Sequence, residues 1–197
     1  GLFAGAERAD SICVNPHKWM LTNFDCDLFW IADRQSLTDA MSITPEYLRN
    51  AATDSGSVID YRDWQVPLGR RFRALKLWFV IRHYGAEGLR AYIREHVAWA
   101  TWLAERIEAS ETLRLATPRS LSLVCFEHVR GDAATEAVLR AVNESGDAFL
   151  SHASVTDASG NTRYIARVAI GSTACRFEHV EALWEKLEAA ASAERAR

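Results

Sequence analysis

Short apolar runs separated by chain breakers mark the first part of the sequence. The run Ser11-Ile12-Cys13-Val14 is followed by Asn15-Pro16, which is typical of a buried strand that ends at a breaker. A second apolar run, Asp27-Leu28-Phe29-Trp30-Ile31-Ala32, predicts a second strand. The stretch from Pro45 to Asp60 predicts a mobile surface loop, and loops of this length inside a compact domain usually have a function.

Helical periodicity replaces these runs in the middle of the chain. Phe72, Leu75 and Phe79 belong to a broad apolar face. This helix is predicted to end at Gly85, because glycine is a natural C-cap. From Glu87 onward, apolar residues at helical spacing predict one long amphipathic helix: Leu89, Ile93, Val97, Ala100, Leu103 and Ile107.

The last part of the chain mixes both patterns. Strands are predicted at 121–126, 149–155 and 164–170, and the last two are separated by a run of turn formers at 157–161. Asp132 is the expected N-cap of one helix, and a last helix carries Val180, Leu183, Trp184 and Leu187. The order strand, helix, strand, strand, helix predicts a small α+β domain beside a larger one.

The composition narrows the class of protein. The 197 residues are 49% hydrophobic, enough for one large domain or parts of two, and the net charge of -3 gives no sign of a nucleic-acid partner. No apolar run approaches the roughly 18 residues of a membrane span, so we expect no membrane partner. The histidines lack metal-ligand spacing, so we expect no metal. The four distant cysteines predict reduced, mostly buried thiols in a cytoplasmic protein.

Arginines at two places are interpreted as structural. The run Arg70-Arg71-Phe72-Arg73 is basic enough to suggest nucleic-acid binding, but these arginines begin a helix. We therefore expect them to pair with carboxylates or with a dimer partner. Arg167 falls in a predicted strand and is expected to be buried and paired.

The segment Asn15-Pro16-His17-Lys18-Trp19 carries the candidate chemistry. It places Lys18 just beyond a strand, on a turn fixed by proline. A lysine held there partly out of water would be a better nucleophile toward an aldehyde, and His17 and Asn15 would be hydrogen-bond donors for a phosphate. From the pattern alone, a solvated surface lysine is the more common outcome.

Longer segments resemble a known family. Residues 15–26 resemble the cofactor-lysine segment of the group II decarboxylases, which depend on pyridoxal 5'-phosphate (PLP). Residues 60–79 resemble the D-Y-R-x-W-Q-I-P-L-G-R-R-F-R-x-L-K-x-W-F block of aromatic-L-amino-acid decarboxylases. A third segment, 84–94, follows in the family's order and spacing, and weaker similarity continues around 167–170 and in the helix from His179.

The resemblance implies a fold and an activity. The fold would be α/β, the fold type I of PLP-dependent transferases (aspartate aminotransferase-like). Residues 1–75 would be the C-terminal part of the PLP-binding large domain, with the cofactor lysine and the mobile loop. Residues 76–197 would be linking helices and a small α+β C-terminal domain. The expected protein is a homodimer with shared active sites, which decarboxylates an aromatic L-amino acid to its amine and carbon dioxide.

The same resemblance assigns roles to single residues. Lys18 would hold PLP as a Schiff base, with His17 and Asn15 at the phosphate. Tyr47 matches the mobile-loop tyrosine that protonates the substrate carbon. Gly69 matches a pocket position for cofactor and substrate, where glycine leaves room for a larger ring. Phe24 would line the substrate pocket, from the neighbouring subunit, with simple core packing as the open alternative.

Several alternatives remain beside this assignment. A histidine decarboxylase usually has serine in place of His17 and Gly69, and a glutamate decarboxylase differs after the lysine. An aromatic aldehyde synthase tends to have phenylalanine at the position of Tyr47. A truncated, non-catalytic dimerisation fragment is the fourth alternative.

Some family groups would lie upstream of this sequence. They are the aspartate at the pyridine nitrogen, the histidine stacked on the ring and the Ser/Ala segment at the phosphate. We therefore expect a missing N-terminal portion as a partner, and weak PLP binding by this piece alone.

Overall fold

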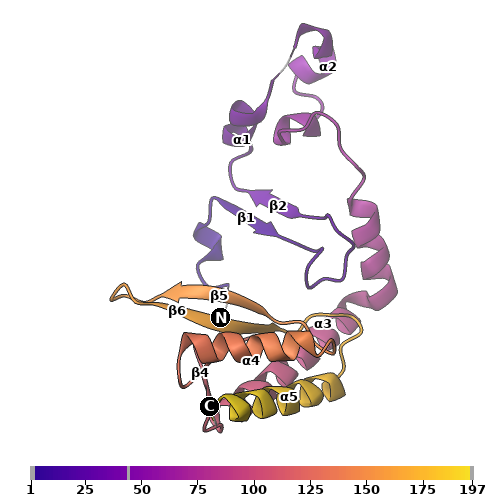
Figure 1. Ribbon diagram of the computed structural model, residues 1–197. Helices are drawn as coiled ribbons and strands as arrows, with labels where there is room; N and C mark the ends of the chain where they lie inside the picture. The colour runs from indigo at the N-terminus through magenta and orange to yellow at the C-terminus, as the bar shows by residue number, and fades with distance from the viewer. Residues whose placement is uncertain (1–2, 44, 196–197) are drawn as a thin grey trace. The chain divides into compact units, whose positions relative to one another are not determined.

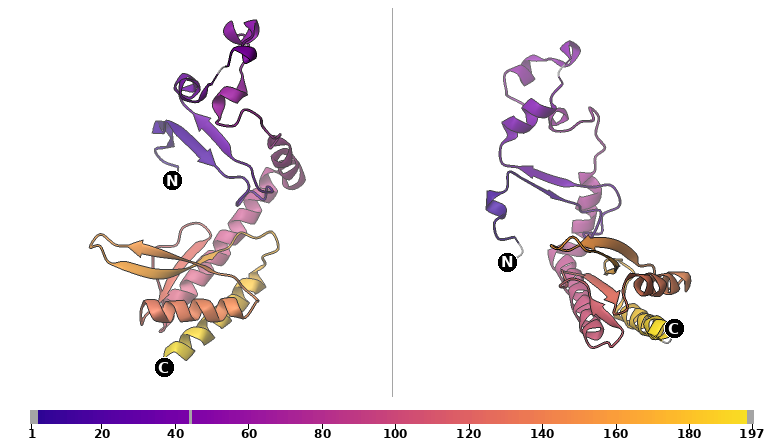
Figure 2. Two further views of the ribbon diagram at one scale, coloured as in Figure 1. Left: turned by 45° about the horizontal axis from the view of Figure 1, so that its top comes forward. Right: turned by 60° about the vertical axis from the view of Figure 1, so that its left-hand side comes forward.

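The computed structural model describes residues 3–43 and 45–195, which fall into two compact units. Unit 1 ends at His83 and unit 2 begins at Tyr84 (Figure 1 and Figure 2). In the described residues, no helix is long and apolar enough to cross a membrane. The four cysteines are free thiols, as predicted, although Cys13 is exposed and Cys175 is only partly buried.

Unit 1 is built around a two-stranded hairpin. Strand β1 (Ser11–Val14) pairs antiparallel with β2 (Leu28–Ile31), so that Ser11 lies opposite Ile31 and Val14 opposite Leu28. Both predicted strands are confirmed. The predicted burial of the first is wrong, because all four residues of β1 are exposed and a two-stranded sheet offers little to cover them.

Short helices follow the hairpin. The helix α1 (Arg34–Met41) starts at Asp33, whose carboxylate accepts hydrogen bonds from the backbone N–H groups of Gln35 and Ser36. The stretch predicted as a loop contains a 3-10 turn, η2 (Glu46–Leu48), and the short helix α2 (Ala51–Asp54). A further 3-10 turn, η3 (Tyr61–Trp64), leads towards the next long helix.

A single glycine interrupts the longest helix. The helix α3 (Ala74–Glu108) has helical backbone except at Gly85, where φ is 67° and ψ is 171°. Side chains with a Cβ rarely adopt such a φ, which explains why glycine stands there. The predicted helix end at Gly85 is confirmed as a break between two helical segments, and an apolar face runs through each.

Unit 2 is a four-stranded antiparallel sheet with helices. Its strands are β3 (Leu113–Leu115), β4 (Leu123–His128), β5 (Ser151–Thr156) and β6 (Thr162–Ala169), in the spatial order β3-β4-β6-β5. Its helices after α3 are α4 (Asp132–Glu144) and α5 (Phe177–Arg195). The predicted small α+β arrangement is confirmed, with β3 as an additional edge strand.

Two details of unit 2 correct the sequence-based expectations. The N-cap of α4 is Gly131, with φ 92°, and Asp132 is the first residue of the helix. Arg167 is half-buried, and its hydrogen bond goes to Ser151 Oγ at 3.4 Å. It is not the fully buried arginine that we expected, because its strand position leaves the guanidinium beside the edge strand β5.

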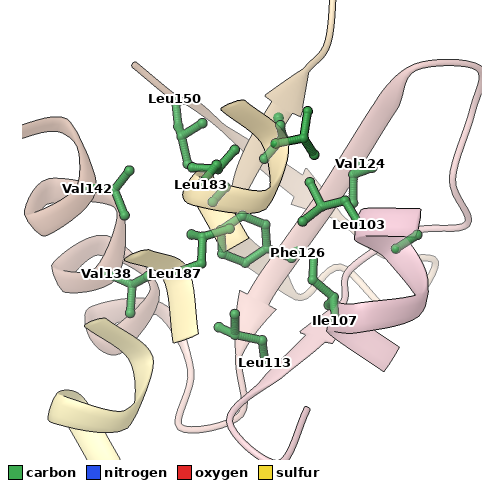
Figure 3. Packing of buried hydrophobic residues seen from close by; sticks show 14 of the residues in the cluster. Leu103, Ile107, Leu113, Val124, Phe126, Val138, Val142, Leu150, Leu183 and Leu187 are labelled. Carbon is green, nitrogen blue, oxygen red and sulfur yellow. The ribbon is translucent and has the colours of Figure 1, made fainter. Parts of the chain in front are cut away.

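The hydrophobic core of unit 2 lies where the sheet meets its helices (Figure 3). Val124 and Phe126 alternate along β4 and therefore point to the same face of the sheet. Phe126 is fully buried and is the largest of the fully buried side chains. The helices contribute Leu103 and Ile107 from α3, Val138 and Val142 from α4, and Leu183 and Leu187 from α5.

Candidate active site

The candidate lysine sits on a tight turn at the end of β1. The backbone N–H of Lys18 donates to the carbonyl oxygen of Asn15 at 3.0 Å, which closes a four-residue turn. Pro16, the second residue of this turn, is buried and fixes its own φ. The Lys18 side chain is exposed, so the expectation that it is held partly out of water is not met in the described structure.

His17 is fixed by the backbone of Cys26. The His17 side chain is 12% exposed, and its Nδ1 atom receives the N–H of Cys26 at 3.0 Å. The carbonyl oxygen of Cys26 lies 2.8 Å from the same atom and also accepts the backbone N–H of His17 at 3.4 Å. Both contacts are made by Nδ1, so the backbone of Cys26 fixes the orientation of the ring while Nε2 takes no part in them.

Asn15 is paired across the end of the hairpin. Val14 lies opposite Leu28, so the next positions outward are Asn15 and Asp27. The Asn15 amide donates from Nδ2 to Asp27 Oδ1, and Asp27 Oδ1 also lies 3.6 Å from His17 Nδ1. A side-chain amide has two donor hydrogens, so one remains for another acceptor.

Phe24, in the loop between β1 and β2, contacts the ring of His17. Its ring centroid is 4.9 Å from that of His17, with the planes at 70°, an edge-to-face contact. Phe24 is nevertheless 83% exposed. Core packing within the described chain is therefore excluded, and the ring is free to form one wall of a site.

Charged side chains connect the loop between β1 and β2 to the start of α3. Arg73 Nη2 lies 3.0 Å from Asp25 Oδ2, and Lys76 Nζ lies 4.0 Å from Asp25 Oδ1. The hydrogen bond from Arg73 lowers the pKa of Asp25 from 3.8 to about 2. The same bond raises the pKa of Arg73. The expected pairing of the arginine run with carboxylates is confirmed for Arg73.

Sequence reasoning missed the residues that hold this turn. Asp25, Cys26 and Asp27 precede the second strand, and none was singled out as part of a site. A signal was present, because two carboxylates flank Cys26 directly before an apolar run. Their partners lie up to 48 positions away, which no local pattern reveals.

Tyr47 lies elsewhere in unit 1. It belongs to η2 and is 78% exposed. Because α1 follows β2, that helix starts from the end of the hairpin opposite to the Lys18 turn (Figure 1). Among the described contacts, none joins Tyr47 to the Lys18 turn, so the structure does not bring these two predicted residues together.

Side-chain contacts hold the C-terminal end of the loop 45–60, which carries Tyr47. Thr53 Oγ1 donates to Asp60 Oδ2 at 2.8 Å, and Arg62 Nη2 lies 3.1 Å from the same oxygen. Arg62 Nε also lies 3.5 Å from Asp63 Oδ1. These contacts join α2 to η3, while at the Tyr47 end of the loop Arg49 Nε lies 3.6 Å from Glu46 Oε2 across η2.

Gly69 lies in an open stretch before α3. It is exposed, and a Cβ placed on it would meet no heavy atom within 4 Å.

The described residues contain no group of three or more His, Cys, Asp or Glu side chains arranged to hold a metal ion. The absence of a metal from the reaction stays a prediction.

Comparison with known proteins gives a consistent set of matches. A family model described as the pyridoxal-dependent decarboxylase conserved domain matches residues 1–129. Tryptophan decarboxylase 2 of Oryza sativa subsp. japonica is 43% identical over 190 residues, which are 93% of this chain and 37% of the relative. Phenylacetaldehyde synthase of Arabidopsis thaliana is 44% identical over 195 residues, 95% of this chain and 39% of the relative.

A solved structure agrees with these sequence matches. The crystal structure of Oryza sativa TDC with PLP and tryptamine superposes with a TM-score of 0.86 at 36% identity. The superposition covers 97% of this chain and 40% of that one. The chain therefore spans about two fifths of the length of the proteins that it resembles. The fold type I assignment, made from the sequence, is confirmed.

Proposed function

The chain belongs to the pyridoxal-dependent decarboxylase family, and from this premise we propose that the protein decarboxylates an aromatic L-amino acid to its amine and carbon dioxide. Lys18 is the proposed cofactor lysine. The observation that carries the proposal is the Lys18 turn, in which an exposed amine stands beside an imidazole whose Nδ1 is held by the backbone of Cys26.

The donor groups of the turn fit PLP. Lys18 offers an accessible primary amine to an aldehyde, while the second amide hydrogen of Asn15 and, when it carries a proton, Nε2 of His17 suit an anionic phosphate. When bound, PLP supplies an electron sink that lets a carboxylate leave as carbon dioxide. The protein supplies attachment, orientation and proton delivery.

Each remaining residue has a proposed task. The Tyr47 phenol delivers a proton to the substrate carbon when its loop closes over the site, which also excludes water. Gly69 leaves space for a large side chain, since nothing lies within 4 Å of a Cβ there. The exposed ring of Phe24 forms a wall for an aromatic substrate.

Replacement of Lys18 in the full-length protein tests the proposal. We expect Lys18→Ala to abolish formation of carbon dioxide and amine from aromatic L-amino acids. Lys18→Arg keeps the positive charge but lacks a nucleophilic amine, and we expect it to be equally inactive. Lys186→Arg is the control and should keep wild-type turnover. Comparable turnover by Lys18→Ala and the wild type would refute the assignment.

Aldehyde synthesis is a second candidate, because a phenylacetaldehyde synthase is among the relatives. A tyrosine at position 47 favours plain decarboxylation. We expect Tyr47→Phe to shift the products from amine towards aldehyde, ammonia and hydrogen peroxide, with oxygen consumed. Tyr61→Phe, at another exposed tyrosine, should leave the product ratio unchanged. An aldehyde made by the wild type would favour the second candidate instead.

We also propose that the full-length protein works as a homodimer with shared active sites. The exposed Phe24 beside His17 would then face a substrate bound between two subunits. Size-exclusion chromatography with light scattering should give the mass of a dimer for the full-length protein. Full turnover by a strictly monomeric species would contradict shared sites. Histidine and glutamate as substrates are tested in the same activity assay.

A further inference from the structure

We propose that Asp27 is a positioning residue for the cofactor site, acting through Asn15 on the turn that carries Lys18. This inference rests on the proposed function, because it concerns how the chain presents Lys18 and His17 to PLP. Asp27 is not expected to contact the substrate. Its role follows from the way in which the hairpin ends.

The register of the hairpin puts Asp27 in reach of Asn15. The pairing of β1 with β2 runs without interruption from Ser11 and Ile31 to Val14 and Leu28. Continuing this register by one residue sets Asn15 against Asp27, and neighbouring side chains of directly opposed residues interact. The hydrogen bond from Asn15 Nδ2 to Asp27 Oδ1 is the result.

Asn15 passes this restraint on to the lysine. It is the first residue of the turn, and its carbonyl oxygen accepts the backbone N–H of Lys18 at 3.0 Å. A fixed Asn15 side chain therefore limits the movement of the residue on which the turn closes. The same hydrogen bond also fixes the direction of the second amide hydrogen of Asn15, because both hydrogens belong to one planar group.

His17 is held beside the same carboxylate. Asp27 Oδ1 lies 3.6 Å from His17 Nδ1, and the backbone nitrogen of Cys26 lies 3.0 Å from the same ring atom. One carboxylate thus borders both side chains that are proposed for the PLP phosphate. Asp27 is itself 52% exposed, so its removal leaves no buried cavity.

Two substitutions separate positioning from general stability. Asp27→Ala removes the acceptor for Asn15, whereas Asp27→Asn keeps an amide oxygen that can accept the same hydrogen bond. In the full-length protein we expect Asp27→Ala to raise the dissociation constant for PLP by about 10-fold, the size of one lost hydrogen bond. Asp27→Asn should stay within about twofold of the wild type, on the same basis.

A matched control exists on α1. Asp39 Oδ1 also accepts a side-chain amide, from Gln35 Nε2 at 2.7 Å, on an exposed surface away from the turn. Asp39→Ala should leave PLP affinity unchanged. All three variants should keep the wild-type midpoint of thermal unfolding, because both carboxylates are solvent-exposed.

An NMR spectrum of the PLP-free full-length protein supplies a readout that does not need the cofactor. The Asn15 side-chain amide resonances should shift in Asp27→Ala, return close to their wild-type positions in Asp27→Asn and be unaffected in Asp39→Ala. If the wild type forms a PLP adduct on Lys18 and Asp27→Ala binds PLP as tightly, the inference is wrong but the proposed function stands. If the wild type forms no adduct on Lys18, the proposed function fails, and this inference fails with it.

Discussion

Single residues decide how the lysine is presented. Pro16 and the hydrogen bond from Lys18 to Asn15 set the turn, while the backbone of Cys26 fixes the imidazole of His17. None of these contacts buries Lys18, so accessibility rather than desolvation distinguishes this amine in the described chain. Asp25 and Arg73 then connect the loop to the first turn of α3.

The Asp25–Arg73 pair gives a prediction about acid. The folded pKa of Asp25 is lowered to about 2 from 3.8, so the pair contributes its full stability above pH 3.8 and loses it as the pH falls towards 2. Arg73→Gln should raise the titration midpoint of Asp25 from about 2 towards 3.8. Carbon-13 NMR of the carboxyl groups measures this midpoint directly.

The control for this titration is the neighbouring exposed arginine. Arg70→Gln removes a positive charge from the same run without touching Asp25, and the Asp25 midpoint should stay near 2. An unchanged midpoint in Arg73→Gln would show that the ion pair is not what lowers this pKa.

At the scale of elements, the break in α3 is the most consequential feature. Gly85 adopts φ 67° between two helical segments, whereas Gly88, three residues later, has helical backbone, and a Cβ placed on it would make only an ordinary contact of 3.6 Å to Tyr84 Cβ. The two glycines therefore have opposite reasons to be present. Glycine is needed at position 85 because φ is positive there, whereas Gly88 weakens the helix in which it lies.

Alanine substitutions separate the two glycines. Gly85→Ala should destabilise the protein by about 1 kcal/mol or more, because alanine is strained at this φ. Gly88→Ala should stabilise it by about 0.5–1 kcal/mol through helix propensity. Urea unfolding measures both free energies, and equal effects of the two substitutions would contradict the assigned break.

The elements also show how far the sequence alone leads. Gly85 was predictable because a glycine directly follows an apolar helical face, and the Lys18 turn because Asn-Pro ends a strand. The strand β3 was missed because three residues carry too little periodicity, and the α4 cap because Gly131 takes φ 92° one residue before Asp132. The Asp25–Arg73 pair was unpredictable because it joins positions 48 residues apart.

At the scale of the whole molecule, the packed core and the candidate site lie in different units. The largest cluster of buried apolar side chains belongs to unit 2, while Lys18, His17 and Tyr47 belong to unit 1. Residues such as Phe29 and Trp30 in β2 remain about half exposed. Substitutions in the core of unit 2 should therefore act on stability before they act on chemistry.

The core prediction uses two phenylalanines of unit 2. Phe126 is fully buried and Phe149 is 86% exposed. Phe126→Ala should lower the free energy of unfolding by about 3–5 kcal/mol, as large-to-small core substitutions do. Phe149→Ala should change it by no more than about 0.5 kcal/mol. Urea unfolding followed by tryptophan fluorescence compares them, and similar losses would contradict the position of the core.

The attachment site of PLP tests the central claim most directly. The full-length protein is incubated with PLP, reduced with borohydride and digested, and the labelled peptide is identified by mass spectrometry. The residues shown here contain only three lysines, Lys18, Lys76 and Lys186, so the result is unambiguous for this chain. We predict a phosphopyridoxyl group on Lys18. A label on Lys76 or Lys186 instead, or no label on this chain at all, would contradict the account.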